Sequence, residues 1–271
     1  MQRDYALLTN LITAESLPVL RDWLAFMPYP PKRLICYCGY NEGNKALLRD
    51  LAEEVGTTLV IAPDTLTEDI RKSDLPVLEW QFAQVEEAYC LKISLDTIPY
   101  QKEPGDWLNP LIDTMEHEGF VFLTGSTRLF RADTPYRDPD LYRTQRISLN
   151  FVIMRPEFWL ELFRTRSDLK AEYGRFACEG IVEHHCREKG LYGLRLANTS
   201  ARRVFHVQIW DDRINARREA IRSDAKVAHF LTGYEDDQRY PWDRYFMFPR
   251  HPLMRRIRIA LGRMRRQALS R

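Results

Sequence analysis

The first hundred residues alternate between short β-rich runs and amphipathic stretches of helical length. The predicted strands cover residues 5–12, 33–39, 58–62 and 90–95, and the predicted helices between them cover 15–26, 44–55 and 75–89. Strands that alternate with helices of this length form βαβ units, so the sequence predicts a parallel sheet covered by helices on both faces. Ligands of such sheets bind at the carboxyl ends of the strands.

The second half continues the alternation less regularly. The predicted helices cover residues 107–118, 156–164 and 177–188, and the predicted strands cover 120–124, 147–154, 191–196 and 204–209, with a polar loop at 128–143. No linker rich in Pro, Gly or Ser and no internal repeat separates the two halves. We therefore expect one α/β domain over residues 1–221, followed by a C-terminal extension over 222–271.

Composition agrees with a soluble globular domain. At 271 residues and 45% hydrophobic content, a chain buries roughly three quarters of the surface that its unfolded form exposes. The longest apolar runs are far shorter than the ~20 residues that span a bilayer, and the N-terminus lacks a signal-peptide pattern, so we expect a cytoplasmic protein. Five cysteines without a CxxC pair predict reduced, mostly buried thiols.

The charge is unevenly distributed. A net charge of +2 is too small to indicate a nucleic-acid partner. From Arg250 onward, however, the chain is rich in Arg and has no acidic residue, and apolar side chains recur at helical spacing between Leu253 and Ala268. This pattern predicts a basic amphipathic helix over 252–269 that lies on an anionic membrane surface, at the inner face of the membrane. Packing against the acidic body of the protein, or against a second subunit in a homodimer, is the alternative.

Asp96 ends the apolar strand that begins at Tyr89. A carboxylate at the carboxyl edge of the sheet is suited to hold a hard divalent cation against a diphosphate. An Asp that caps a turn after the strand is the alternative.

The order of elements up to Asp96 resembles the nucleotide-binding half of GT-A glycosyltransferases, which belong to the nucleotide-diphospho-sugar transferase superfamily. In that family the strand ends in an Asp-x-Asp motif whose last Asp ligates the metal ion on the donor diphosphate. Here the motif is Ser94-Leu95-Asp96, with Ser in the first position. The resemblance implies a three-layer α/β/α, Rossmann-like GT-A fold with a C-terminal helical appendage, and a donor site that includes Ser94 and Asp96.

The second half carries the same resemblance. Residues 146–159 are similar to the family's segment in which a strand presents small or polar residues, here Asn150, to the sugar. Many family members then have a Glu-Asp pair whose Asp is the catalytic base, with a Gly eleven positions later. Cys178-Glu179 occupies the pair and Gly190 follows Glu179 by eleven positions, which implies that Glu179 is the base. A Glu that only stabilises the first turn of its helix is the alternative.

A metal site follows from the same resemblance. The family often carries a histidine after the base helix and one further strand, and His206 is at this position. The resemblance thus implies that Asp96 and His206 hold Mg²⁺ or Mn²⁺, while a histidine buried in the core is the alternative. Asp64, Arg71 and Lys72, after the third strand, are candidates for contacts with the nucleotide base, ribose or phosphates, or else form a solvated loop.

Other sites are weakly supported. A zinc site at Cys178, His184, His185 and Cys186 would need side chains on diverging faces of one helix. The sequence matches neither a P-loop nor a dinucleotide fingerprint, and a Ser nucleophile elbow is absent.

These features predict an inverting glycosyltransferase. The enzyme would move a sugar from a nucleotide-diphosphate donor to a hydroxyl of a saccharide or lipid-linked saccharide, in surface polysaccharide or glycolipid biosynthesis. A nucleotidyltransferase of related fold is one alternative, although residues 9–12 lack the glycine- and basic-rich phosphate loop of that class. An inactive GT-A-like binding or scaffold protein is the other, because Ser94 and Cys178 depart from the family motifs.

Overall fold

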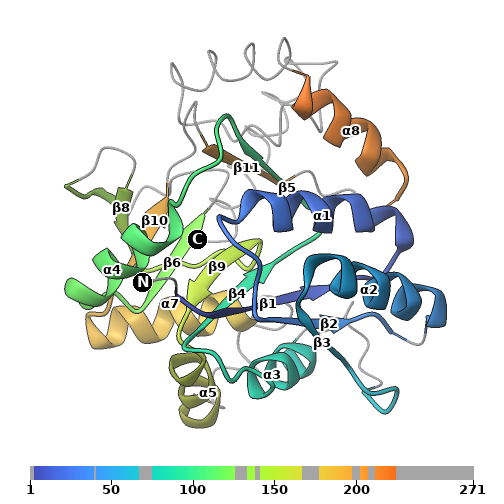
Figure 1. Ribbon diagram of the computed structural model, residues 1–271. Helices are drawn as coiled ribbons and strands as arrows, with labels where there is room; N and C mark the ends of the chain where they lie inside the picture. Colours follow the sequence, from blue (N-terminus) through green and yellow to red (C-terminus); the bar gives the residue numbers. More distant parts are fainter. Residues whose placement is uncertain are drawn as a thin grey trace, which may run out of the picture.

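A nine-stranded mixed sheet forms the centre of the described part of the molecule (Figure 1). The computed structural model describes residues 3–39, 41–66, 75–125, 133–137, 141–166, 177–196, 202–206 and 211–223. The strand order is β3-β2-β1-β4-β9-β6-β10-β8-β7. A second, two-stranded sheet pairs β11 with β5.

The first half of the chain is the predicted run of βαβ units. Its parallel strands are β1 (Tyr5–Asn10), β2 (Arg33–Tyr37), β3 (Thr58–Ile61) and β4 (Tyr89–Ile93). The segments between them are η1 (Ala14–Ser16) with α1 (Leu17–Phe26), α2 (Glu42–Val55) and α3 (Leu75–Ala83). The bounds of α2 have clear causes, because Asn41 accepts a capping hydrogen bond from Asn44 N at 3.1 Å and Gly56 adopts a φ of 72° that glycine tolerates.

The second half is mixed in direction. Its strands are β6 (Phe122–Gly125), β7 (Thr134–Pro135), β8 (Leu141–Thr144), β9 (Phe151–Met154) and β10 (Gly193–Leu196). β9 runs antiparallel between β4 and β6, and β8 runs antiparallel to β10. The parallel sheet predicted from the first hundred residues is confirmed for β1 to β4, whereas no direction was predicted for the strands of the second half. Strands buried on both faces have the same apolar pattern whichever way they run, so the sequence pattern did not reveal the reversal.

Three predicted elements also needed correction. The helix expected over 75–89 ends at Ala83, where Gln84 N and Val85 N bond to carbonyls three residues back and close the last turn. The chain does not leave strand structure after Asp96 but enters β5 (Thr97–Gln101), which accommodates Pro99 because a two-stranded sheet has only edge strands. The loop expected over 128–143 contains β7 and the start of β8.

Helices cover both faces of the large sheet, which makes three layers. The apolar cores show the division: α1, α2 and α4 (Leu108–His117) pack on one face, and α3, α5 (Pro156–Thr165) and α7 (Ala177–Lys189) pack on the other. α8 (Arg213–Arg222) packs against η1, α1 and β5. In Figure 1, α1 and α2 lie above the strands and α3 and α5 lie below them. The α/β fold class predicted from the sequence is confirmed.

The cysteines agree with the sequence prediction. All five are free and buried. Burial raises the pKa of the Cys36 and Cys186 thiols to about 12, which makes both poor nucleophiles at neutral pH.

Two observations concern membranes. Among the described residues, none of the helices is long and apolar enough to cross a bilayer. The basic helix predicted over 252–269 lies outside the described residues.

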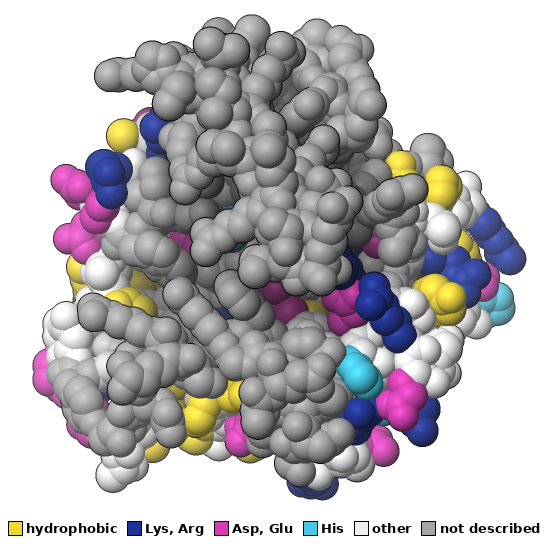
Figure 2. Space-filling view, turned by 180° about the vertical axis from the view of Figure 1, so that it is seen from behind, with side chains coloured by type: hydrophobic (Ala, Val, Ile, Leu, Met, Phe, Trp, Pro, Cys, Tyr) yellow, Lys and Arg dark blue, Asp and Glu magenta, His cyan; other side chains and the backbone are white. Residues whose placement is uncertain are grey.

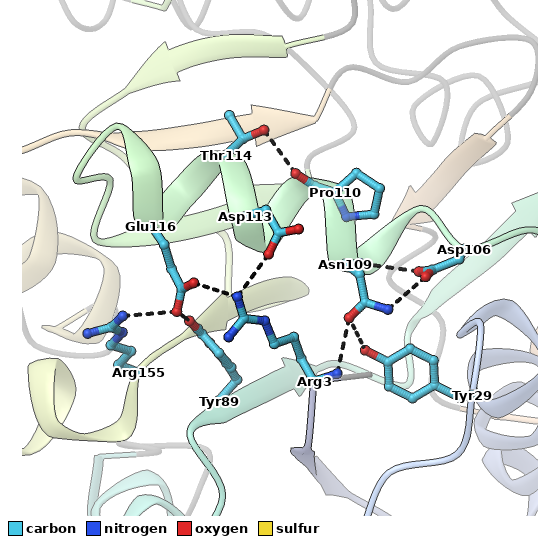
Figure 3. Close-up of polar contacts among 10 residues, drawn as sticks. All are labelled: Arg3, Tyr29, Tyr89, Asp106, Asn109, Pro110, Asp113, Thr114, Glu116 and Arg155. Carbon is cyan, nitrogen blue, oxygen red and sulfur yellow. Dashed lines mark hydrogen bonds and ion pairs between the residues drawn. The ribbon is translucent and has the colours of Figure 1, made fainter. Parts of the chain in front are cut away.

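Glu116 of α4 joins three parts of the chain at the amino edge of the parallel strands (Figure 3). Its carboxylate accepts hydrogen bonds from Arg3 at 2.7 Å, from Arg155 at 3.1 Å and from the Tyr89 hydroxyl. The bond from Tyr89 is the largest cause that lowers the pKa of Glu116, and the charge of Arg3 adds to it. These contacts tie the N-terminal segment, β4 and the residue after β9 to one helix.

We expect Glu116→Gln to lower the free energy of unfolding by about 1–2 kcal/mol at pH 7, because charge-assisted hydrogen bonds become neutral ones. A carboxyl whose folded pKa is depressed stabilises the fold above its unfolded pKa, near 4.3, and this contribution is lost as pH falls through the folded pKa. The difference from wild type in urea unfolding should therefore shrink as pH falls below 4.

Asp113→Asn is the matched control for Glu116. Both carboxylates pair with Arg3, but the side chain of Asp113 is 62% exposed whereas that of Glu116 is 28% exposed. The control should change stability by less than about 0.5 kcal/mol. Equal effects of the two variants, or a difference that persists at pH 3, would contradict this account.

Candidate active site

The carboxyl ends of six parallel strands lie along one edge of the sheet. From one side to the other these strands are β3, β2, β1, β4, β6 and β10. The chain moves outward from β1 through α1 and α2 on one face, and returns to β4 through α3 on the other face. The strand order thus reverses between β1 and β4, which is where open α/β sheets bind ligands.

Asp96 lies at this edge, in the turn between β4 and β5. Its carboxylate is buried and accepts a hydrogen bond from the Ser94 hydroxyl at 2.5 Å through Oδ1. The turn is closed by Thr97 N, which donates to Ser94 O at 3.2 Å. The Ser94 hydroxyl therefore orients the Asp96 carboxylate.

The small sheet brings His206 to Asp96 across 110 residues of sequence. β11 (Arg202–His206) pairs antiparallel with β5, and this register sets His206 opposite Thr97, the residue after Asp96. His206 Nε2 consequently lies 3.0 Å from Asp96 Oδ2, a distance at which an Nε2–H donates to the carboxylate. Trp23 of α1 holds β5 in place by donating its Nε1–H to Thr97 O at 2.8 Å.

The spacing of these two groups suits a divalent cation. A cation would need the His206 tautomer that carries its proton on Nδ1, because an Nε2–H that donates to Asp96 leaves no lone pair for a metal ion. Neighbouring ligands of an octahedral ion with bonds of about 2.1 Å lie about 3.0 Å apart, which is the separation of Asp96 Oδ2 and His206 Nε2. Within the described residues, no group of three or more His, Cys, Asp or Glu side chains could hold a metal ion. The remaining ligands would therefore have to be water and substrate phosphates, as is usual for Mg²⁺ in phosphate-binding sites.

Glu179 lies in the first turn of α7. Its Oε1 accepts a hydrogen bond from Leu149 N at 3.0 Å, and the next residue, Asn150, accepts one from Ser94 N at 3.3 Å through its carbonyl oxygen. Glu179 and Asp96 are thus both linked to the backbone segment 148–150, Glu179 directly and Asp96 through Ser94. Both the helix dipole and the bond from Leu149 favour the ionised carboxylate.

The segment to which Glu179 and Asp96 are both linked is held firmly. Gln145 donates to the carbonyls of Cys186 and Leu191 at 3.2 and 3.1 Å, and Arg146 pairs with Glu183 at 2.7 Å. At its other end, Ser148 N donates to the Thr124 hydroxyl at 3.0 Å. The loop before β9 is therefore fixed to α7 and to β6.

A buried ion pair lies beneath this loop. Arg195 of β10 is 0% exposed and Asp133 is 2% exposed, and their side chains meet at 2.9 Å. Arg195 also donates to Arg146 O at 2.7 Å and to the Thr144 hydroxyl at 3.2 Å. Burial lowers the pKa of the Arg195 guanidinium, and the charge of Asp133 opposes this shift. Sequence analysis missed this residue, although an arginine within the apolar strand 193–196 was a visible signal.

Removing Asp133 should be strongly destabilising, because Arg195 would keep a buried charge without its carboxylate. We expect Asp133→Ala to lower the free energy of unfolding by about 3–5 kcal/mol, measured by urea denaturation. Asp211→Ala is the control, since that carboxylate pairs with Arg213 on the surface, and it should leave the urea midpoint close to that of the wild type. A small effect of Asp133→Ala would show that Arg195 does not depend on this partner.

The nucleotide-side candidates are only partly described. Asp64 is exposed and pairs with Lys45 at 2.6 Å, while Lys45 also pairs with Glu42 at 2.6 Å. The two carboxylates raise the pKa of Lys45. Arg71 and Lys72 lie outside the described residues. The contact role of Asp64 therefore stays a prediction.

Sequence reasoning also missed two buried polar residues near the carboxyl edge. Gln81 of α3 donates to Thr9 O at 2.7 Å and to Asn10 Oδ1 at 3.0 Å, at the end of β1. Lys92, within β4, donates to Ile93 O at 3.1 Å. A lysine in an apolar strand was again the available signal, whereas Gln81 has no distinguishing pattern in its amphipathic helix.

The comparisons with known proteins bear on the fold. No family model and no curated protein matches the chain. A solved UDP-glucose pyrophosphorylase complexed with UDP-glucose has a TM-score of 0.53 at 8% identity, covering 85% of this chain and 100% of that chain. The UDP-glucose pyrophosphorylase from Acinetobacter baumanii also has a TM-score of 0.53 at 8% identity, covering 87% of this chain and 99% of that chain.

These likenesses extend over most of the described chain. The protein therefore has a Rossmann-like α/β fold similar to that of these two UDP-glucose pyrophosphorylases. At 8% identity the similarity concerns the fold, and function has to be argued from the site.

Proposed function

We propose that the chain is a GT-A glycosyltransferase that moves a sugar from a nucleotide-diphosphate donor to an acceptor hydroxyl. The observation that carries the proposal is the 3.0 Å contact between Asp96 and His206, which the β5–β11 pairing makes at the carboxyl edge of the sheet. The acceptor is a saccharide or lipid-linked saccharide of a surface polysaccharide or glycolipid.

In this proposal Asp96 and His206 hold a divalent cation, which neutralises charge on the diphosphate leaving group when it is bound. Mn²⁺ suits the pair better than Mg²⁺, because an imidazole nitrogen is a poor ligand for the harder ion. Ser94 orients Asp96, and Asn150 contacts the sugar of the donor. Asp64, Arg71 and Lys72 contact the nucleotide.

Glu179 is the proposed base that removes the proton of the acceptor hydroxyl as it attacks the anomeric carbon. Its bond to Leu149 N supports this role, because it holds the carboxylate at the segment whose next residue, Asn150, bonds to Ser94 N beside Asp96. The single displacement inverts the anomeric configuration. The bond from Leu149 N holds the Glu179 carboxylate in place through Oε1.

Nucleotidyl transfer is the second candidate, because both compared structures are UDP-glucose pyrophosphorylases. The residues after β1 argue against it. Leu11 N donates to Tyr37 O at 2.8 Å, and the Asn44 amide donates to the carbonyls of Leu11 and Ile12. The Leu11 N–H is thus used inside the fold, and residues 9–12 lack the glycine- and basic-rich phosphate loop of that class.

The proposed membrane contact of residues 252–269 and the proposed homodimer rest on sequence alone. A lipid-linked acceptor would lie at a membrane surface, so a basic amphipathic helix would bring the enzyme to its substrate. This part of the proposal is independent of the site chemistry.

The reaction type is tested by incubating the protein with a panel of nucleotide sugars and Mn²⁺. Glycosyl transfer, or slow hydrolysis of the donor, releases nucleoside diphosphate, and Asp96→Asn and EDTA should each abolish this release. Nucleotidyl transfer in reverse instead makes nucleoside triphosphate when pyrophosphate is added. If nucleoside triphosphate is formed and no nucleoside diphosphate is released, the protein is a nucleotidyltransferase and the glycosyltransferase proposal is wrong.

The base is tested by Glu179→Gln. We expect transfer to fall by at least ~100-fold with unchanged donor affinity, because Gln still accepts the bond from Leu149 N but takes up no proton. Glu157→Gln is the control, since Glu157 is also in the first turn of its helix, α5, and should leave turnover unchanged. Near-normal turnover of Glu179→Gln would show that another residue is the base. Retention of the anomeric configuration in the product would exclude a single displacement with direct base catalysis.

A further inference from the structure

An open cavity of about 560 Å³ lies along α7, beginning at the residue next to Glu179. The described residues that line it are Arg146, Gly180, Glu183, His184, Arg187 and Glu188. α7 is at the lower left of Figure 1, and in the reverse view of Figure 2 basic, acidic and histidine side chains mix at the lower right. All five side chains of the described wall are ionisable, and none is aliphatic or aromatic.

Three residues of the cavity wall lie near the candidate base, Glu179. Gly180 follows Glu179 in the chain, and Glu183 lies one turn further along the same helix. Arg146 lies three residues before Leu149, whose amide binds Glu179. A molecule in this cavity would therefore extend away from the base along α7.

The wall offers more hydrogen-bond donors than acceptors. Both carboxylate oxygens of Glu183 are engaged, Oε2 by Arg146 at 2.7 Å and Oε1 by Arg187 at 2.5 Å. Glu188 pairs with Arg166. Arg187 pairs with Glu183 through one Nη atom, but its side chain is 55% exposed and keeps further N–H donors of its fixed fork, which match a carboxylate or phosphate group.

A solvated helix face with exchanging surface ion pairs would also show alternating charges. Such a face has no reason to surround a cavity beside the candidate base, or to use both oxygens of the one carboxylate between two arginines. The cavity and the excess of donors together indicate a binding site for an anion.

We propose that this cavity is the acceptor subsite, and that it takes a hydroxyl-rich saccharide bearing an anionic group. The inference rests on the proposed function. Arg187 binds the anionic group, Arg146 and Glu183 form the wall between it and the base, and the hydroxyl that reacts lies at the Gly180 end. The anionic group is either the carboxylate of a uronic acid or a sugar phosphate.

The test is a binding titration of the full chain, followed by NMR of the arginine Nε–H groups, with three probes. The probes are glucuronate, glucose 1-phosphate and neutral glucose, without donor or metal. We expect at least one anionic probe to bind ~10-fold or more tightly than glucose, and Arg187→Gln to remove this preference. The stronger of the two anionic probes then identifies the source of the charge.

Arg222→Gln is the matched control. The Arg222 side chain is 56% exposed and forms a single described ion pair, with Asp22, on the distant helix α8, so this variant should bind like wild type. Equal binding of all three probes, or an Arg187→Gln variant that binds anions as well as wild type, would overturn the inference.

The failure of this inference differs from the failure of the proposed function. Anion binding that depends on Arg187 supports the site even if no sugar is transferred. If instead transfer occurs with an unchanged acceptor KM in Arg187→Gln, the proposed function stands and the cavity is not the acceptor subsite.

Discussion

The antiparallel pairing of β5 with β11 is the constraint on which the candidate site depends. Asp96 comes from the first half of the chain and His206 from the second, and only the register that sets His206 opposite Thr97 brings them within 3.0 Å. This small sheet is in turn held against α1 by the bond from Trp23 to Thr97 O. The large sheet positions Asp96 at the carboxyl edge, and the small sheet places His206 beside it.

The loop before β9 links this pair to the rest of the carboxyl edge. It is held from α7 by Glu179 and Glu183, and from beneath by Arg195, which is paired with Asp133 inside the fold. Burying this ion pair costs free energy that well-packed apolar residues would not cost. In return, Arg195 holds the backbone of the loop before β9, which bonds to Glu179 and to Ser94.

The elements of the fold that could be predicted are those whose buried side chains leave a periodic apolar pattern in the sequence. The βαβ half was readable because its helices are amphipathic and its strands are short apolar runs, and Asp96, Glu179 and His206 could be selected from their order along the chain. The antiparallel direction of β9 could not be predicted, because a strand buried on both faces has the same apolar pattern in either direction. β5 could not be predicted because it contains Pro99, and proline is rare inside strands. Arg195 and Gln81 matter through partners more than 45 residues away, which local patterns do not encode.

The central claim is that Asp96 and His206 share one metal ion with a nucleotide diphosphate. Pulsed electron paramagnetic resonance of Mn²⁺ tests it most directly, since a directly bound histidine nitrogen modulates the manganese signal. With protein, Mn²⁺ and UDP present, we predict a nitrogen coupling that persists in the matched variant His184→Ala and disappears in His206→Ala. A manganese signal without nitrogen coupling in the wild-type complex, or the same coupling in His206→Ala, would contradict the account.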